Sequence, residues 1–245
     1  MKTAFIWLGR LAAFLGLSAF IFLLLQGPGY QAGWWDIGTS FRGNFPKIVI
    51  AGGLAILLGT LAFIGPRFIK EPSVKLGLIG VIAGLSAAIV PISIKKTAES
   101  VPPIHDITTD TRNPPAFVDM LELRKDAPNP ASYDPAIAQQ QLDAYPDLQT
   151  LELSASNTDV FSAALKVVDS FGWDNVSSDV KTGRIEATDT TTWYGFKDDV
   201  VIRIQASGAQ TLVDVRSKSR LGKSDLGANA KRIRKFLDAL QSRVN

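Results

Sequence analysis

Apolar residues dominate the first 96 positions of the chain, whereas apolar and charged residues alternate in the rest. A helix needs about 20 apolar residues to cross the hydrocarbon core of a bilayer. Three stretches meet that length, near residues 4–25, 48–65 and 74–94. In the third, Gly80, Gly84 and Ala88 recur at four-residue spacing, which either lets a neighbouring helix approach closely or reflects the frequency of glycine in membrane helices. The pattern predicts an all-α transmembrane region of three helices over residues 1–96.

Proline is frequent in residues 97–147, which follow the apolar region. The positions are Pro102, Pro103, Pro114, Pro115, Pro128, Pro130, Pro135 and Pro146. Proline at this density blocks helix interiors and central strands. We therefore expect an extended arm, laid along a surface or acting as a tether.

The last hundred residues, 148–245, alternate between strand and helix patterns. Strand patterns cover residues 148–153, 173–180, 184–192, 199–206 and 210–218, and helix patterns run from Asn157 or Thr158, as N-cap, to Phe171 and from Asp225 to Arg243. The order β-α-β-β-β-β-α with short connections predicts a two-layer α+β domain, an antiparallel sheet with two helices on one face.

Alternation along the strands assigns side chains to the two faces of that sheet. Val213 and Val215 point towards the helices together with Ser217 and Ser219, whereas the charged residues between them point to the other face, which is expected to be open: Asp214, Arg216, Lys218 and Arg220. Two interpretations remain, a solvated face with cross-strand ion pairs or a surface that docks a headgroup or a protein.

Composition narrows the possible functions. The formal net charge is only +3 at a pI near 9.1, so nucleic acid is not an expected partner. The chain has no cysteine, which excludes disulfides, thiol nucleophiles, iron–sulfur clusters and cysteine-ligated zinc. No cofactor is expected.

Charges near the predicted membrane helices indicate their orientation. With the N-terminus inside, the inner side holds Lys2, Arg10, Arg67, Lys70 and Lys75, and the outer side holds Arg42, Lys47, Lys95 and Lys96. Basic residues favour the cytoplasmic side. This pattern predicts an integral inner membrane protein whose C-terminal domain is periplasmic.

Positive charge gathers where the last strand meets the last helix. Residues 216–235 contain eight Lys or Arg and a single Asp. Gly222-Lys223-Ser224 resembles the end of a phosphate-binding P-loop, but Ser217 stands where that motif needs its first glycine. The corner is either a structural turn or an anion site at a helix N-terminus. The candidate ligand-binding residues are Arg216, Arg220, Lys223, Ser224, Asn229 and Arg232.

The only histidine, His105, lies in the proline-rich arm next to Asp106 and near Asp110. One imidazole with two carboxylates is a sparse metal ligand set, and such residues more often make local turn hydrogen bonds. No metal site and no catalytic residue is therefore assigned. The alternative is a hydrolase-like envelope enzyme that uses His105 and Asp110, with Arg220 as an anion clamp.

Four segments follow one another along the chain: IHDITTDT, NPPAF, DDVVIRI and DVRSKSRLGKSDLGANAKRIRKFL. Over roughly residues 101–243 the chain resembles the domain of unknown function 1499 (DUF1499) family. The last segment matches best, at Ser217, Ser219, Arg220, Gly222, Ser224, Asp225, Gly227, Asn229, Arg232 and Ile233. The resemblance implies an envelope-facing or lumen-facing domain and no specific activity.

These observations favour a membrane-anchored envelope protein that binds rather than catalyses, because a single histidine is available as a base near neutral pH. The expected partners are the lipid bilayer, an anionic ligand or lipid headgroup, and a membrane or envelope protein.

Overall fold

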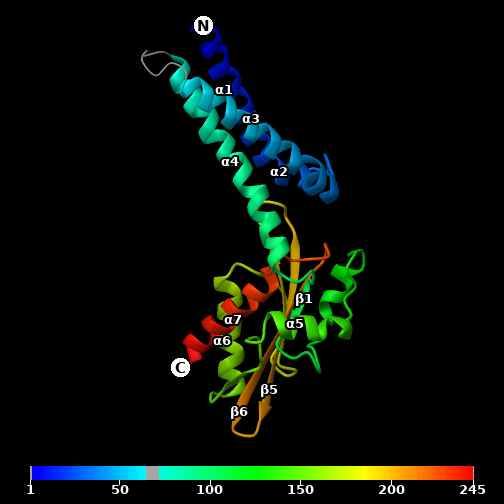
Figure 1. Cartoon of the computed structure of the whole chain (residues 1–245). Coiled ribbons are helices and arrows are strands. Elements are labelled where there is room, and N and C mark those ends of the chain that lie inside the picture. Colours follow the sequence, from blue (N-terminus) through cyan, green and yellow to red (C-terminus); the bar gives the residue numbers. More distant parts are fainter. Residues whose placement is uncertain (1, 65–71, 245) are drawn as a thin grey trace. The chain divides into compact units, whose positions relative to one another are not determined.

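The computed structural model describes residues 2–64 and 72–244 and divides into two compact units, Met1–Thr97 and Ala98–Asn245. The first unit is helical (Figure 1). Its elements are α1 (Lys2–Leu24), α2 (Gln26–Gln31), a π-helical segment η1 (Thr39–Asn44), α3 (Phe45–Ile64) and α4 (Pro72–Ser100), which runs past the end of the unit.

Three helical stretches of the first unit are long and apolar enough to cross a membrane: Thr3–Leu24, Thr39–Ile64 and Val74–Ser100. The predicted three-helix region is confirmed, and its third helix continues six residues beyond Ile94. Residue 65, at the end of the predicted second helix, and the charges at Arg67 and Lys70 lie outside the described residues.

Glycines bring the helices of this unit into close contact. A Cβ on Gly80 would lie 2.6 Å from the Ala12 carbonyl carbon on α1, and one on Gly84 would lie 2.6 Å from the Gly52 carbonyl oxygen on α3. Real Cβ atoms do not come so near, so α4 can pack against both neighbours only because these positions carry no side chain. Of the two interpretations of the four-residue spacing, close helix approach is the correct one.

A buried polar cluster ties the end of α1 and the start of α2 to η1. The Gln26 amide nitrogen donates to the Phe22 carbonyl at 2.9 Å, and its amide oxygen accepts from Ser40 Oγ at 2.9 Å and Asn44 Nδ2 at 3.0 Å. Gln26 and Ser40 are fully buried. The polar groups of this cluster satisfy one another, as groups away from water must.

The second unit is an α+β domain, as predicted. Its elements are β1 (Asp106–Thr108), 3₁₀ helices η2 (Asp119–Arg124) and η3 (Pro135–Ile137), α5 (Ala138–Ala144), β2 (Leu151–Leu153), α6 (Asn157–Ser170), β3 (Asp174–Asp179), β4 (Arg184–Thr190), β5 (Lys197–Ser207), β6 (Gln210–Ser219) and α7 (Ala228–Val244). All pairings are antiparallel in the order β1-β6-β5-β4-β3, and β2 also pairs with β6.

Helices α6 and α7 lie side by side and cover one face of the sheet (Figure 1). The core between the two layers consists of alternate strand residues and the apolar stripes of both helices, including Ile185, Val200, Ile202, Val213, Val215, Val160, Val168, Ile233, Phe236 and Leu240. The Trp173 ring stacks on Phe236 with centroids 5.9 Å apart. Periodicity of 2 in the strands and of about 3.6 in the helices is what directs these residues inward.

The other face of the sheet is covered, and the expectation that it is open was wrong. Asp214, Arg216 and Lys218 are buried. The proline-rich segment lies over them, with Phe117 and Met120 packed against Val201 of β5. This segment also supplies β1, which the sequence pattern did not predict because three residues are too few for a strand signal.

Two helix starts differ from those predicted. Ser156, one residue before the expected Asn157 or Thr158, is the N-cap of α6, and its hydroxyl accepts the Asp159 N–H. The last helix begins at Ala228 rather than Asp225.

Candidate functional site

Charged residues face one another across the strands at one end of the covered face. Asp106 on β1 is opposite Lys218 on β6, which is opposite Asp199 on β5, which is opposite Thr188 on β4. The side chains of these residues point to the same face because directly paired residues share a side of the sheet. One row of the sheet thus holds two carboxylates, an ammonium and a hydroxyl, all buried.

Asp106 is shared by two cations. Arg216 donates to both carboxylate oxygens, from Nε at 2.9 Å and from Nη2 at 2.8 Å, and Lys218 Nζ donates at 2.9 Å. The three side chains are 2 to 3% exposed. Burial lowers the pKa of the Lys218 ammonium, although the Asp106 carboxylate opposes this effect.

Asp199 is also shared by two cations. Arg220 donates to its two oxygens from Nε and Nη2, both at 2.8 Å, and Arg124 from the proline-rich segment donates from Nη1. Thr188 Oγ1 donates to the same carboxylate at 2.7 Å. The side chains of Arg124 and Asp199 are 1% and 0% exposed, whereas Arg220 is 17% exposed, so this cluster is buried except at Arg220.

The two clusters contain four cations and two carboxylates, a formal surplus of two positive charges. The opposite surplus occurs elsewhere on the same face, where Arg203 is shared by Asp110 and Asp214, and Arg184 by Asp119 and Glu186. The face is therefore neutral in sum but has a cationic end and an anionic end. Buried charge without a matching counter-charge costs stability.

Two buried donors at the cationic end have no hydrogen-bond partner among the described residues, Arg124 Nε and the Tyr133 hydroxyl. The Tyr133 ring lies 5.5 Å from the Arg216 guanidinium. Burial raises the pKa of Tyr133 to about 12, so its hydroxyl keeps its proton at neutral pH. Unsatisfied buried donors are rare in folded proteins. These two donors, like the surplus of positive charge, favour a hydrogen-bond acceptor at this end of the face.

A cavity of about 220 Å³ lies beside the Asp106 cluster. Its lining consists of Pro103, Ile104, His105, Asp106, Asp134, Ile137, Lys218 and Lys223. Asp134 is already engaged, because its Oδ1 accepts the Ala136 N–H at 3.0 Å at the start of η3. The wall therefore combines an apolar part with two lysines, one buried and one from the β6–α7 loop, and with the carboxylates of Asp106 and Asp134.

The β6–α7 loop brings Lys223 to this cavity through an unusual backbone. Gly222, Leu226 and Gly227 have φ angles of 98°, 56° and 78°. Glycine adopts such angles freely, whereas for leucine the left-handed region costs about 1–2 kcal/mol. His105 Nδ1 lies 3.3 Å from the Lys223 carbonyl oxygen, a contact that requires the Nδ1–H form of the ring. Strain of this kind often accompanies functional loops.

The six candidate ligand-binding residues are divided between several networks. Arg216 and Arg220 belong to the two carboxylate clusters on the covered face. Arg232 and Asn229 lie on the helix side, where Arg232 pairs with Asp189 and Asp198 and donates to Ser217 Oγ at 3.1 Å. Only Lys223 of the six lines the cavity.

Side chains of the β6–α7 loop already accept the backbone N–H groups at the start of α7 and just before it. Asp225 accepts the N–H groups of Gly227 and Asn229, each at 2.8 Å, and Ser224 Oγ accepts from Leu226 at 3.2 Å. Burial raises the pKa of Asp225, while these two N–H groups oppose that shift. The backbone donors expected for an anion are therefore used by side chains within the loop.

The three acidic and imidazole candidates of the proline-rich segment do not converge. Asp106 belongs to its cation cluster, whereas Asp110 accepts from the Arg112 and Asn113 N–H groups and from Arg203. Within residues 2–64 and 72–244, no hydrogen bond joins His105, Asp110 and Arg220. The same residues contain no group of three His, Asp or Glu side chains placed to hold a metal ion.

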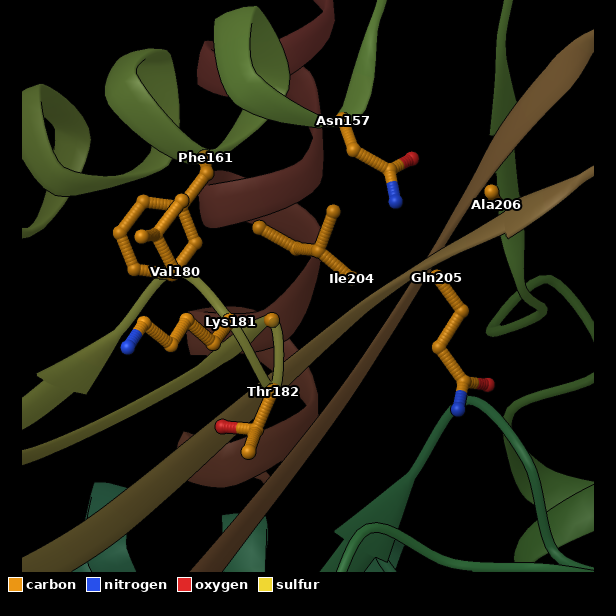
Figure 2. A pocket seen from close by; sticks show the side chains of 9 residues that line it. Asn157, Phe161, Val180, Lys181, Thr182, Ile204, Gln205 and Ala206 are labelled. Atoms are coloured by element: carbon orange, nitrogen blue, oxygen red, sulfur yellow. The ribbon is translucent and has the colours of Figure 1, made fainter.

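A second cavity, of about 230 Å³, lies between the first turns of α6, the β3–β4 turn and the end of β5 (Figure 2). Asn157 and Phe161 reach it from α6, and Lys181 and Thr182 from the turn. Asn157 Oδ1 already accepts from Thr211 at 2.8 Å. None of the described residues that line this cavity is both charged and buried, so it has less reason to bind an ion than the cavity beside Lys218.

Lys218 is the residue of the cavity that sequence reasoning missed. Its alternation with Arg216 and Arg220 placed it on the correct face, but as one outward charge among several. The signal available in the sequence was the row of four charged side chains on one face of a single strand, from Asp214 to Arg220.

Comparison with known families gives one match. The model of the family described as "Protein of unknown function (DUF1499)" matches residues 106–240, more than half of the chain. The match begins at β1 and ends within α7, so it includes both carboxylate clusters and most of the cavity lining. None of the curated proteins matches the chain.

Proposed function

Since the chain belongs to the DUF1499 family, whose description contains no activity, we propose a function from its geometry: it is a membrane-anchored binding protein that holds a small organic anion in the cavity beside Lys218. The observation that supports this proposal is the Arg216–Asp106–Lys218 cluster, in which two buried cations share one carboxylate at the cavity wall. A carboxylate or phosphate next to Lys218 would supply the missing counter-charge.

Lys218 keeps donor capacity for such a ligand. An ammonium has three N–H donors, and two of those on Lys218 are directed to Asp106 and to the Ser132 carbonyl oxygen at 2.7 Å. Lys223 at the rim adds a second cation. The buried lysine fixes the anionic group, and the exposed one raises the local concentration of anions at the entrance.

The apolar part of the wall indicates what the ligand carries besides its charge. Pro103, Ile104 and Ile137 form this part. Small-molecule sites combine an apolar lining with a few placed polar groups. A short apolar chain attached to the anionic group would pack on these residues, which favours an organic anion over an inorganic one.

Catalysis has less support. A hydrolase would need His105 close to a carboxylate and an anion clamp, yet Asp110 is bound to Arg203 and Arg220 to Asp199. The contact of His105 with the Lys223 carbonyl oxygen fits a positioning role at the cavity rim.

For the location of this function we propose the inner membrane, with the C-terminal domain in the periplasm. If each of the three helices long enough to span a membrane crosses it once, the two ends of the chain lie on opposite sides. The distribution of basic residues favours the N-terminus inside.

The proposal can be tested by thermal unfolding of the full chain in detergent micelles at constant ionic strength. Inorganic phosphate and butyrate serve as probe anions. A ligand that binds only the folded state at 100 times its Kd raises the free energy of unfolding by about 2.7 kcal/mol. We expect a saturable rise in Tm, larger for the anion with an apolar part.

Matched variants identify the site. Lys218→Met and Lys223→Met each remove one cation of the cavity, whereas Lys231→Met removes an exposed cation on α7. Only the first two should weaken the rise in Tm. An equal rise in all three variants would mean that the anions act through general screening and would exclude the cavity as their site.

A further inference from the structure

Three large apolar side chains of the domain are exposed within six residues of one another. Val118, Leu121 and Leu123 are 47%, 50% and 52% exposed. They lie at and within η2, the 3₁₀ helix of the proline-rich segment. In the described part of the domain, the other exposed large apolar residues are isolated, Leu142 on α5 and Val180 at the β3–β4 turn. A cluster of exposed apolar side chains marks an interaction surface more often than single ones do.

The segment that carries these exposed side chains is held to the sheet by hydrogen bonds and an ion pair. The buried Glu186 carboxylate accepts the N–H groups of Val118, Asp119 and Met120, at 2.8, 3.3 and 2.7 Å. Arg124, at the other end of η2, is buried against Asp199. The segment is thus fixed at both ends, and its apolar side chains are held in solvent by the fold.

The charges next to the cluster are paired. Asp119 forms an ion pair with Arg184 at 3.1 Å, and Glu122 forms one with Lys125. The surface therefore has no basic patch to select anionic lipids and little unpaired acidic charge to be repelled by headgroups. Such a surface fits a zwitterionic lipid interface.

The covalent structure of the chain favours lipid over another protein as the occupant. Helix α4 belongs to the third stretch able to cross a membrane, and only residues 101–105 separate its last residue from β1. A short tether gives the tethered surface a high effective concentration near its target. For this domain, the apolar phase with the highest local concentration is the bilayer.

We propose that η2 docks its Val118, Leu121 and Leu123 side chains on the lipid surface of the bilayer that holds the chain. The contact is apolar, so it does not depend on lipid charge. Interfacial amphipathic helices bury their apolar face about 5–10 Å into the boundary between headgroups and acyl chains, and the three η2 side chains would enter the same region. The docking is independent of the anion cavity, and either proposal can fail without the other.

Because the chain contains no cysteine, a single introduced cysteine can be labelled at one chosen position. Leu121→Cys and Leu123→Cys, each labelled with an environment-sensitive fluorophore, report on η2, and Val180→Cys is the matched control at an exposed apolar position. The labelled full chain is reconstituted in phosphatidylcholine vesicles with and without lipids that carry a nitroxide quencher. We expect quenching of about twofold or more at both η2 positions and little at position 180.

The result should be unchanged when phosphatidylglycerol replaces part of the phosphatidylcholine. Equal quenching at positions 121 and 180, or none at either η2 position, would overturn the proposal. So would a blue-shifted emission that appears in lipid-free micelles and grows with protein concentration, because that result identifies a second copy of the chain as the occupant. Melting curves of the labelled variants verify that each one is folded.

Discussion

At the scale of single residues, the covered face of the sheet depends on carboxylates that each serve two cations. Asp106 accepts three hydrogen bonds from Arg216 and Lys218, and the three side chains are only 2 to 3% exposed. Removing one member of a buried ion cluster costs stability when it leaves an uncompensated charge behind, as the loss of Asp106 does and the loss of Lys218 does not. Different members of one cluster should therefore respond differently to substitution.

Asp106→Asn is expected to lower the free energy of unfolding by about 3–5 kcal/mol, because it leaves two buried cations without their carboxylate. Chemical denaturation of the full chain in micelles measures this change. Asp147→Asn is the control, since Asp147 pairs with Arg234 at the surface, where both side chains are at least 40% exposed. If both variants lost a similar amount of unfolding free energy, burial of the Asp106 cluster would not be the cause of the loss.

The pKa of Asp225 predicts a pH dependence. Burial raises it above the ordinary value of 3.8, so between the two values the folded state binds more protons than the unfolded state. The contribution of Asp225 to stability is therefore full below about pH 4 and is lost as pH rises through the folded-state pKa. Unfolding of the wild type and Asp225→Asn from pH 4 to 8 should show this loss in the wild type alone. Parallel curves would refute it.

At the scale of elements, sequence periodicity predicted which residues of a helix or strand face the core. Which segments pack on those elements depends on contacts between residues far apart in the sequence. The alternation of β6 identified both faces correctly, from Val213 to Arg220. What covers the second face was not predictable, because the covering segment is irregular and its contacts join residues such as Val118 and Glu186, 68 positions apart. The same holds for the candidate site. Lys223 was predicted as a ligand-binding residue from the turn that contains it, whereas Lys218, which lines the same cavity, could be recognised only from the position of the proline-rich segment over β6.

Close helix approach in the membrane unit gives a prediction at this scale. Gly84→Val should destabilise the helical unit by about 1–3 kcal/mol, because its side chain would meet the Gly52 carbonyl oxygen and the Ala55 side chain. Gly53→Val is the matched control on α3, since no described atom beyond its own helix turn lies within 4 Å of a Cβ there. Thermal unfolding in micelles compares the two. If Gly53→Val proves equally harmful, the cost comes from β-branching in a helix rather than from packing.

At the scale of the whole molecule, three crossings, for which the three candidate spans are long enough, would put the connection between the first two spans and the C-terminal domain on the same side of the membrane. Asp36 lies in that connection and Lys231 on α7. With the proposed orientation, both positions face the periplasm.

Single-cysteine variants Asp36→Cys and Lys231→Cys test this arrangement in cells with a permeabilised outer membrane. A membrane-impermeant maleimide should label both without lysis. Labelling of both only after lysis would reverse the orientation, and labelling of one alone would contradict three crossings.

The central claim is that the cluster around Asp106 lacks a counter-charge that an anion supplies next to Lys218. Titration calorimetry of butyrate into the full chain, at constant ionic strength, tests it most directly. We predict one saturable site in the wild type and none in Lys218→Met, a variant that should melt no lower than the ligand-free wild type because it leaves Arg216 and Asp106 as a balanced pair. Equal affinity in both proteins, or a marked loss of stability in Lys218→Met, would contradict the account.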